Sequence, residues 1–147
     1  MEAVPNTQKE SQRQGPVTAT EVTDATQRLE CLPQLVGFDC VLLEHTVYDM
    51  LRMLSEDYSG GLWAYYRLSN GGFYMAPEKQ QVYRIRCDGN GFVGDVDADV
   101  AGILACAMAY SHLSFRTRDE RFARAFELLS DFIHHHPEAR RIRAALD

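Results

Sequence analysis

The fold is decided by residues 62–77, LWAYYRLSNGGFYMAP. Side chains alternate between two aromatic-rich faces from Leu62 to Leu68, which is the period of a β-strand. Asn70-Gly71 follows, and this pair is a strong hairpin signal because both residues tolerate a positive φ. Residues 73–76 would form the return strand, which Pro77 ends because proline cannot donate to the ladder. The stretch therefore predicts an antiparallel hairpin with aromatic side chains on both faces.

A third strand is predicted by the same alternation over residues 81–87, after a polar turn at residues 78–80. Three strands joined by short turns indicate an antiparallel meander.

Helices are predicted before and after these strands in the chain, from apolar residues spaced about 3.6 apart. Their ranges are 23–37, capped by Thr23 or Asp24; 44–57; a helix capped by Asp95 or Asp97; 118–134; and a short last helix with Pro137 at its first position. The uncharged run 100–115 is shorter than the roughly 20 residues of a membrane span, so it predicts a buried helix. The expected fold class is α+β, with a small three-stranded meander sheet packed against four or five helices.

The first 20 residues are polar and are interrupted by Pro5, Gly15 and Pro16. They cannot bury enough apolar surface to offset the entropy of ordering, so we expect a disordered tail at 1–20 and a single domain at 21–147. The tail contains no apolar stretch that could act as a signal peptide, which favours a cytoplasmic protein with reduced thiols. The four cysteines form no C-x-x-C pair, which excludes a zinc knuckle.

The charge of the chain is neither strongly basic, as in a duplex-binding protein, nor strongly acidic, as in a DNA mimic. Its 15 basic and 21 acidic residues give a formal net charge of −6. A duplex-binding protein needs a net excess of Lys and Arg to displace phosphate counterions, and a DNA mimic would need far more acids. Residues 115–147 hold seven of the basic residues together with six acids, a mixture typical of a solvated helix face, although a weak nucleic-acid patch stays possible.

Two stretches carry metal-ligand residue types, and neither has the spacing of a site. Consecutive helical residues point about 100° apart, so His134, His135 and His136 cannot all face one ion. The loop at 88–99 is rich in oxygen ligands, but Phe92 and Val93 occupy positions where an EF-hand needs an oxygen and a glycine. Helix capping explains its carboxylates, so no metal and no cofactor are expected.

Nucleophiles are present without the groups that would activate them. Cys40 lies five residues from His45, and Ser111 and His112 are sequential neighbours that diverge on a helix. No nucleophile elbow of the G-x-S-x-G type and no phosphate-binding glycine loop are found. We therefore expect no catalytic residues, with a small Cys or Ser hydrolase as a minor alternative.

A long run of sequence resembles the ArdB/KlcA antirestriction proteins. It extends from Tyr58 to Glu78 and includes the aromatic strand and the Leu-Ser-Asn-Gly-Gly turn. The order continues in segments 89–91, 101–103, 109–112, 136–139 and 146–147, so the resemblance covers about residues 25 to 147.

The resemblance implies a bacterial, mobile-element protein that protects incoming DNA by inhibiting host type I restriction-modification enzymes without catalysis. The partner would be the restriction complex, with no sequence-specific DNA binding, no membrane, and a monomer favoured over an oligomer. An acidic DNA mimic that competes for the methyltransferase core is the alternative. Core packing explains most strand aromatics, with one or two left as partner anchors. The candidate partner-binding residues are Trp63, Tyr65, Asn70, Tyr74, Asp95, Asp97 and Asp147.

Overall fold

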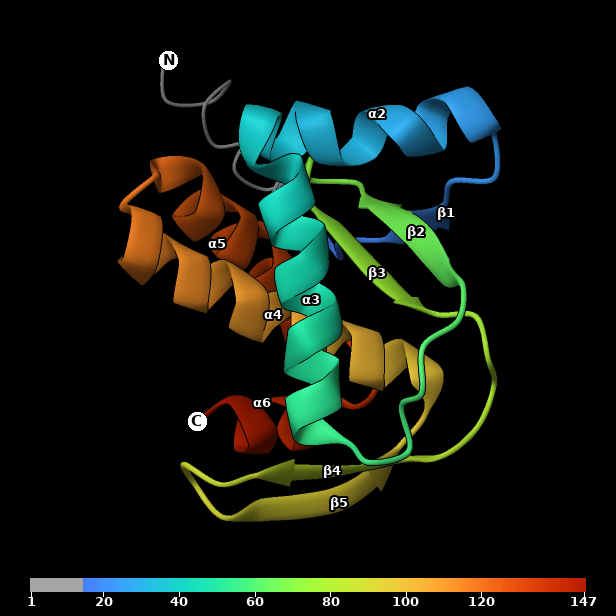
Figure 1. The fold of residues 1–147 in the computed structure, drawn as a ribbon, viewed down its shortest axis with the longest axis vertical. Helices are drawn as coiled ribbons and strands as arrows, with labels where there is room; N and C mark the ends of the chain where they lie inside the picture. The colour runs from blue at the N-terminus through green and yellow to red at the C-terminus, as the bar shows by residue number, and fades with distance from the viewer. Residues whose placement is uncertain (1–14) are drawn as a thin grey trace, which may run out of the picture.

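The structure is a computed structural model that describes residues 15–147. Its helices and strands follow one another in a mixed order (Figure 1). The elements are β1 (Ala19–Glu21), α2 (Ala25–Val36), the 3₁₀ turn η1 (Gly37–Asp39), α3 (Cys40–Leu54), β2 (Trp63–Leu68), β3 (Phe73–Pro77), β4 (Tyr83–Cys87), β5 (Phe92–Val96), α4 (Ala98–Thr117), α5 (Glu120–His134) and α6 (Ala139–Leu146). The predicted α+β class is confirmed.

Two separate antiparallel sheets replace the single predicted meander. The first has the order β1-β2-β3, and β4 pairs with β5 in a second, two-stranded sheet. The β2–β3 hairpin has the predicted form, with Trp63 opposite Pro77 and Arg67 opposite Phe73. The prediction that residues 81–87 join this hairpin is wrong.

The reason lies at the outer edge of β3, which helix α4 covers. Met75 donates its backbone N–H to Cys106 Sγ at 3.4 Å, and the Tyr110 hydroxyl donates to the Phe73 carbonyl at 2.6 Å. These α4 side chains take the positions that a fourth strand would need. A Cβ on Gly102 would lie only 2.4 Å from the Met75 carbonyl oxygen, so glycine permits this close approach.

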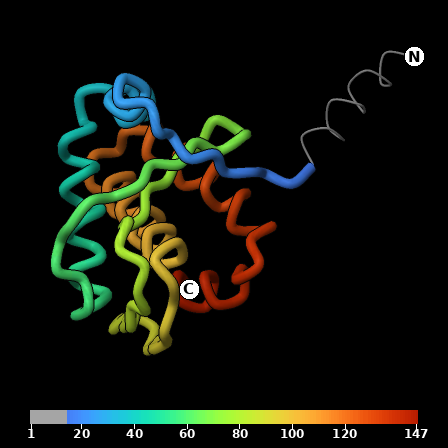
Figure 2. Tube along the Cα trace, turned by 90° about the vertical axis from the view of Figure 1, so that its right-hand side faces the viewer, coloured from blue at the N-terminus to red at the C-terminus, as the bar shows by residue number. Residues whose placement is uncertain are grey.

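Helix α4 forms the centre of the core. Its residues from Val100 to Ala107 are buried, which confirms the predicted buried helix over this part. The end of the predicted run 100–115 is not buried, since Phe115 is 82% exposed. Figure 2 shows α4 between α3 on one side and the C-terminal helices α5 and α6 on the other. By length and composition α4 is also the one described helix that could cross a membrane, but 67% of that stretch is buried inside the fold.

The predicted disordered tail at 1–20 includes residues that the structure places in a strand. Residues 1–14 of that prediction lie outside the described residues, but Ala19 and Thr20 belong to β1 and pair with Leu68 and Arg67. Backbone hydrogen bonds to an existing strand order this polar segment, although it buries little apolar surface. The Thr18–Ser69 pair extends the contact, with Thr18 N–H donating to Ser69 Oγ at 2.9 Å.

The helix ends mostly follow the predicted caps. Asp24 caps α2 by accepting from the Gln27 N–H at 3.0 Å, and Asp97 caps α4 by accepting from the Val100 N–H at 2.9 Å. Helix α3 begins at Cys40 rather than Glu44 because the 3₁₀ turn leads directly into it. The last helix begins at Ala139, two residues after the predicted Pro137.

Candidate functional site

The aromatic side chains of the first sheet are mostly core residues. Trp63 is 3% and Tyr74 2% exposed, so the expectation that they form exposed anchors is wrong. The Trp63 indole N–H donates to the Tyr58 hydroxyl at 3.1 Å. The centroids of the Trp63 and Tyr48 rings are 5.3 Å apart. A large ring with its polar atom satisfied is stable in the interior and offers no contact area to a partner.

Tyr65 is the partly accessible aromatic of the candidate set. The guanidinium of Arg28 lies 4.5 Å above its ring, and the Phe73 ring meets it edge-on at 5.5 Å. Arg28 also donates to the Trp63 carbonyl at 3.0 Å, which fixes the cation over the ring. Tyr65 is therefore a half-buried ring held in one orientation by α2.

The Asn70 hairpin is tied to α5. The Asn70 carboxamide accepts from the Gly72 N–H at 3.0 Å and donates to the Leu128 carbonyl at 2.9 Å. Gly71 adopts a φ of 92°, whereas the φ of Asn70 is not positive, so the turn uses the freedom of the glycine alone. A Cβ on Gly72 would lie 2.9 Å from Leu128 Cβ, so the turn packs directly against the helix.

A partly buried hydrogen-bonded cluster joins three distant segments, and it was not predicted. The Tyr74 hydroxyl donates to Asp99 Oδ1 at 2.5 Å, and His136 Nε2 lies 3.0 Å from Asp99 Oδ2. His136 Nδ1 accepts from the Glu138 N–H at 2.9 Å, so Nε2 carries the proton and donates. The Phe132 ring stacks on Tyr74 at 5.5 Å and encloses the group. We call Tyr74, Asp99 and His136 the Tyr-Asp-His cluster.

The hydrogen bonds decide how the acidic member of the cluster titrates. Burial by itself raises the pKa of Asp99, but the hydrogen bonds from His136 and Tyr74 outweigh it and set the net pKa below the ordinary aspartate value. Burial and the bond to Asp99 raise the pKa of the Tyr74 hydroxyl, which stays a donor. Both ring nitrogens of His136 are bonded, so neither is free to act as a general base. The cluster therefore has a structural role: it links β3, α4 and the segment that follows α5.

No sequence pattern could have indicated this cluster. Tyr74 and Asp99 are 25 residues apart, and Asp99 and His136 are 37 apart. Of the three consecutive histidines only His136 turns inward, while His134 and His135 are exposed. Within residues 15–147, no group of three or more His, Cys, Asp or Glu side chains could hold a metal ion.

Three carboxylates of the oxygen-rich loop at 88–99 have structural roles: Asp99 in the cluster, and Asp95 and Asp97. Asp95 pairs with Arg84 at 3.2 Å, and its backbone carbonyl accepts from Arg141 at 2.7 Å. Asp97 caps α4, and Asp147 lies exposed at the end of α6. Asp95 and Asp97 lie on or next to the second sheet, while Tyr65 and Asn70 belong to the first, at another end of the molecule (Figure 1). The structure therefore divides the candidate contact residues between two regions.

Comparisons with known proteins define the class. A family model described as "Antirestriction protein" matches residues 56–147. The chain is 42% identical over 137 residues to the antirestriction protein KlcA of Escherichia coli, covering 90% of this chain and 96% of that one. It is 32% identical over 146 residues to the putative antirestriction protein YubI of Escherichia coli K12, with coverages of 90% and 96%. The chain belongs to the antirestriction protein family.

A solved structure shares both fold and sequence with this chain. It matches with a TM-score of 0.82 and 39% identity, over 90% of this chain and 96% of that one. That structure is described as showing, for the KlcA and ArdB proteins, a novel fold and antirestriction activity against type I DNA restriction systems in vivo but not in vitro. The resemblance to the ArdB/KlcA proteins stated from the sequence is confirmed.

Proposed function

We propose that this protein protects incoming DNA in a bacterial cytoplasm by inhibiting type I restriction, through contact with the restriction complex and without catalysis. The observation that carries the proposal is the 39% identity, at a TM-score of 0.82, to a structure described as having activity against type I systems in vivo. The protein would leave modification largely intact and act as a monomer.

The buried cysteines support a role without chemistry. Burial raises the pKa of Cys106 to about 12, so this thiol stays protonated, and it is bonded to the backbone of Met75. Burial also raises the pKa of the Cys87 thiol. These two thiols suit packing better than nucleophilic attack. The candidate nucleophiles Cys40 and Ser111 are both partly buried, and His112 beside Ser111 is exposed on α4.

Plating of unmodified phage tests the proposed activity. We expect expression of the protein to raise the plating efficiency on a host with a type I system by at least tenfold. The control is a host without restriction, where expression should change nothing. Progeny phage should still carry the host modification. An unchanged plating efficiency on the restricting host would contradict the proposal.

Two further measurements separate the mechanisms. Crosslinking in cells, followed by recovery of restriction, modification and specificity subunits, should identify a protein contact. A DNA mimic would instead compete with duplex for the methyltransferase core and lose potency steeply with salt. For a hydrolase, C40A or S111A should abolish protection in a folded protein, whereas we expect both variants to retain it.

A further inference from the structure

The net charge of the chain is concentrated in one segment. Residues 21–57, which include α2, η1 and α3, contain eight acidic and two basic residues. Their formal charge of −6 equals that of the whole chain, because the other residues contain 13 acids and 13 bases. Figure 2 shows α3 along one side of the molecule and α6 on the opposite side. The negative charge therefore belongs to the side of the molecule that α2 and α3 form.

The two cations of this segment are already bound, whereas most of its acids are not. Arg28 lies over the Tyr65 ring and donates to the Trp63 carbonyl, and Arg52 pairs with Asp49 at 3.1 Å. In the described part of the chain, Asp49 is the one acid of this segment that has an ion pair within 4.0 Å. The fold therefore leaves the negative charge of α2 and α3 uncompensated.

The same segment exposes a group of large apolar side chains. Phe38, Val41 and Leu42 follow the i, i+3, i+4 spacing that places side chains on one face of a helix. Phe38 is fully exposed, Val41 is 63% exposed, and Leu29 on α2 is 79% exposed. Single apolar residues on a surface are normal, but a group of them bordered by charged residues is typical of a contact site.

Leu29 and Val41 line a groove between α2 and α3, one from each helix. The volume of the groove is about 410 Å³, and Tyr65 of β2 and Glu44 of α3 also line it. Figure 1 shows β2 within the angle between the two helices. Glu44 is held in place because its Oε1 accepts from the Tyr48 hydroxyl at 3.0 Å. We call this feature the α2–α3 groove; it combines apolar walls with a positioned carboxylate.

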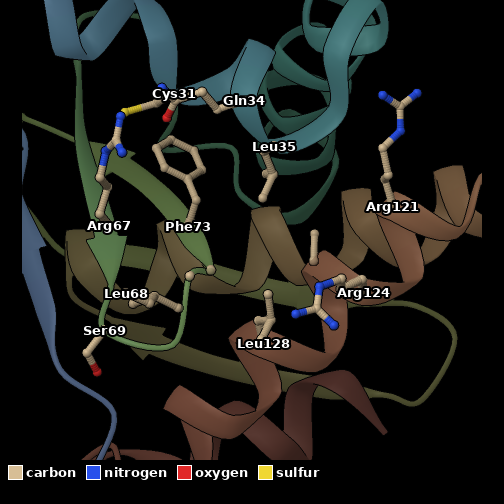
Figure 3. Close-up of a pocket in the computed structure, with 13 residues that line it drawn as sticks. Cys31, Gln34, Leu35, Arg67, Leu68, Ser69, Phe73, Arg121, Arg124 and Leu128 are labelled. Carbon is tan, nitrogen blue, oxygen red and sulfur yellow. The ribbon is translucent and has the colours of Figure 1, made fainter.

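The other face of α2 borders a region of opposite charge. A pocket between α2, the β2–β3 hairpin and α5 is lined by Arg67, Arg121 and Arg124, and no acidic residue lines it (Figure 3). Gln34 borders this pocket and Leu29 borders the α2–α3 groove, and five residues along a helix correspond to roughly 140° of rotation. A positively charged partner is therefore attracted to the groove and repelled on the other face of α2.

Charge distinguishes the possible occupants of the groove. A second copy of the chain would place one acidic surface against another, and a nucleic-acid strand is also negative, so both are disfavoured. Residues 1–14 contain two acids and two bases, so they have no net charge to neutralise the groove. A protein segment with basic residues beside an apolar face complements both the exposed apolar side chains and the uncompensated carboxylates.

We propose that the α2–α3 groove receives a basic amphipathic helix of the protein that this chain contacts. The apolar face of that helix packs between Leu29 and Val41. Its Lys and Arg side chains lie beside Glu44 and the acidic surface of α2 and α3. Amphipathic helices bind apolar grooves in this way, through side chains spaced three and four residues apart. This inference rests on the proposed function for the nature of the partner.

A peptide titration tests the groove without the partner. The full chain, with ¹³C-labelled methyl groups, is titrated with acetyl-KLKKLLKKLKKL-amide, and NMR follows the Leu29 and Val41 methyl signals. We expect a saturable shift of both signals. The scrambled acetyl-KLKLKKLKKLKL-amide keeps the charge without an apolar face, and acetyl-ELEELLEELEEL-amide keeps the apolar face with the opposite charge. Each should bind at least tenfold more weakly. Equal binding of the scrambled peptide, or shifts confined to other residues, would overturn the proposal.

The carboxylate of the groove is tested in the same titration. E44Q keeps an oxygen that can accept from Tyr48 but removes the charge, and it should weaken binding of the basic peptide at least threefold. The matched control is E56Q, since Glu56 is exposed and does not line the groove. Equal losses in the two variants would mean that overall charge alone attracts the peptide, which contradicts a site at the groove.

Two measurements examine the other occupants. Sedimentation equilibrium should give a monomer at low and at high salt. A dimer that L29Q/V41Q abolishes would mean that a second copy fills the groove, and the proposal would be wrong. A short DNA duplex should leave the Leu29 and Val41 methyl signals unchanged, and a saturable shift with the duplex would also overturn the proposal.

Variants connect the groove to protection in cells. L29Q/V41Q should reduce phage protection at least tenfold, because it removes the apolar walls and keeps every charge. The matched control is M53Q/L62Q, since Met53 and Leu62 are 73% and 76% exposed and do not line the groove. Thermal melting checks that both variants fold. Full protection by folded L29Q/V41Q overturns the groove, whereas absence of protection by the unaltered chain overturns the proposed function itself.

Discussion

Single residues show most clearly what the sequence could and could not predict. Asp97 was predicted as a helix cap because capping is local, and it accepts from a residue three positions later. Asp99, two residues on, looks the same in the sequence. Its role depends on Tyr74 and His136, which the fold brings from far away. Local chemistry is visible in a sequence, whereas partners across the core are not.

The Tyr-Asp-His cluster leads to a prediction about stability and pH. D99N should lower the free energy of unfolding at pH 7, because the amide cannot accept hydrogen bonds from both Tyr74 and His136. We expect a loss of only about 1 kcal/mol, since the Asp99 side chain is 39% exposed and solvent weakens its interactions. Since folding lowers the pKa of Asp99, its contribution is complete above the unfolded value of about 3.9 and is lost as pH falls through the folded value. Urea titrations at pH 7 and in the acid range measure the difference.

The exposed Asp88 offers the control for this measurement. D88N should change the free energy of unfolding by less than about 0.5 kcal/mol, as expected for a surface site. If the gap between the unaltered chain and D99N stays constant into the acid range, Asp99 is not held as a carboxylate by the cluster.

At the scale of elements, the sequence predicts which residues form a helix or a strand better than it predicts which strands pair with each other. Residues 83–87 form a strand as their alternation indicates, but their partner is β5 and not β3. The signal for β5 was present, because Asn90-Gly91 repeats the hairpin signal of Asn70-Gly71, and Gly91 has a φ of 75°. The oxygen-rich loop drew attention to metal chemistry instead. The covering of the β3 edge by α4 had no local signal.

The contact between α4 and β3 can be tested at one glycine. G102A should destabilise the protein by about 1–3 kcal/mol, because the new Cβ would lie 2.4 Å from both the Met75 carbonyl oxygen and Ala76 Cβ. The matched control is G89A, since nothing lies within 4 Å of a Cβ there and its φ is not positive. Equal melting temperatures for both variants would contradict the close packing.

At the scale of the whole molecule, one core connects both sheets. Val96 from the second sheet and Phe73 from the first belong to the same buried cluster as α4. The second sheet is further tied to α6, because Asn90 donates to the Ala145 carbonyl at 2.9 Å. The α+β class and the central helix were predicted from composition and periodicity. The division of the candidate contact residues between two regions was not predicted, because it depends on the tertiary arrangement of the two sheets.

A shared core predicts cooperative unfolding. Urea denaturation followed by the fluorescence of Trp63, which lies in the first sheet, should coincide with the transition followed by far-ultraviolet circular dichroism. Trp63 is the single tryptophan and is 3% exposed, so its emission should shift to the red on unfolding. Transition midpoints that differ between the two probes would show that unfolding is not two-state.

The burial of the first part of α4, residues 100–107, restricts how the core of the protein can move. A helical segment that is packed on every side cannot slide or rotate without opening voids in a close-packed interior. Under the proposed function, the core within residues 15–147 would change little on docking, as in rigid-body association. Adjustment of shape would then fall mainly to the restriction complex.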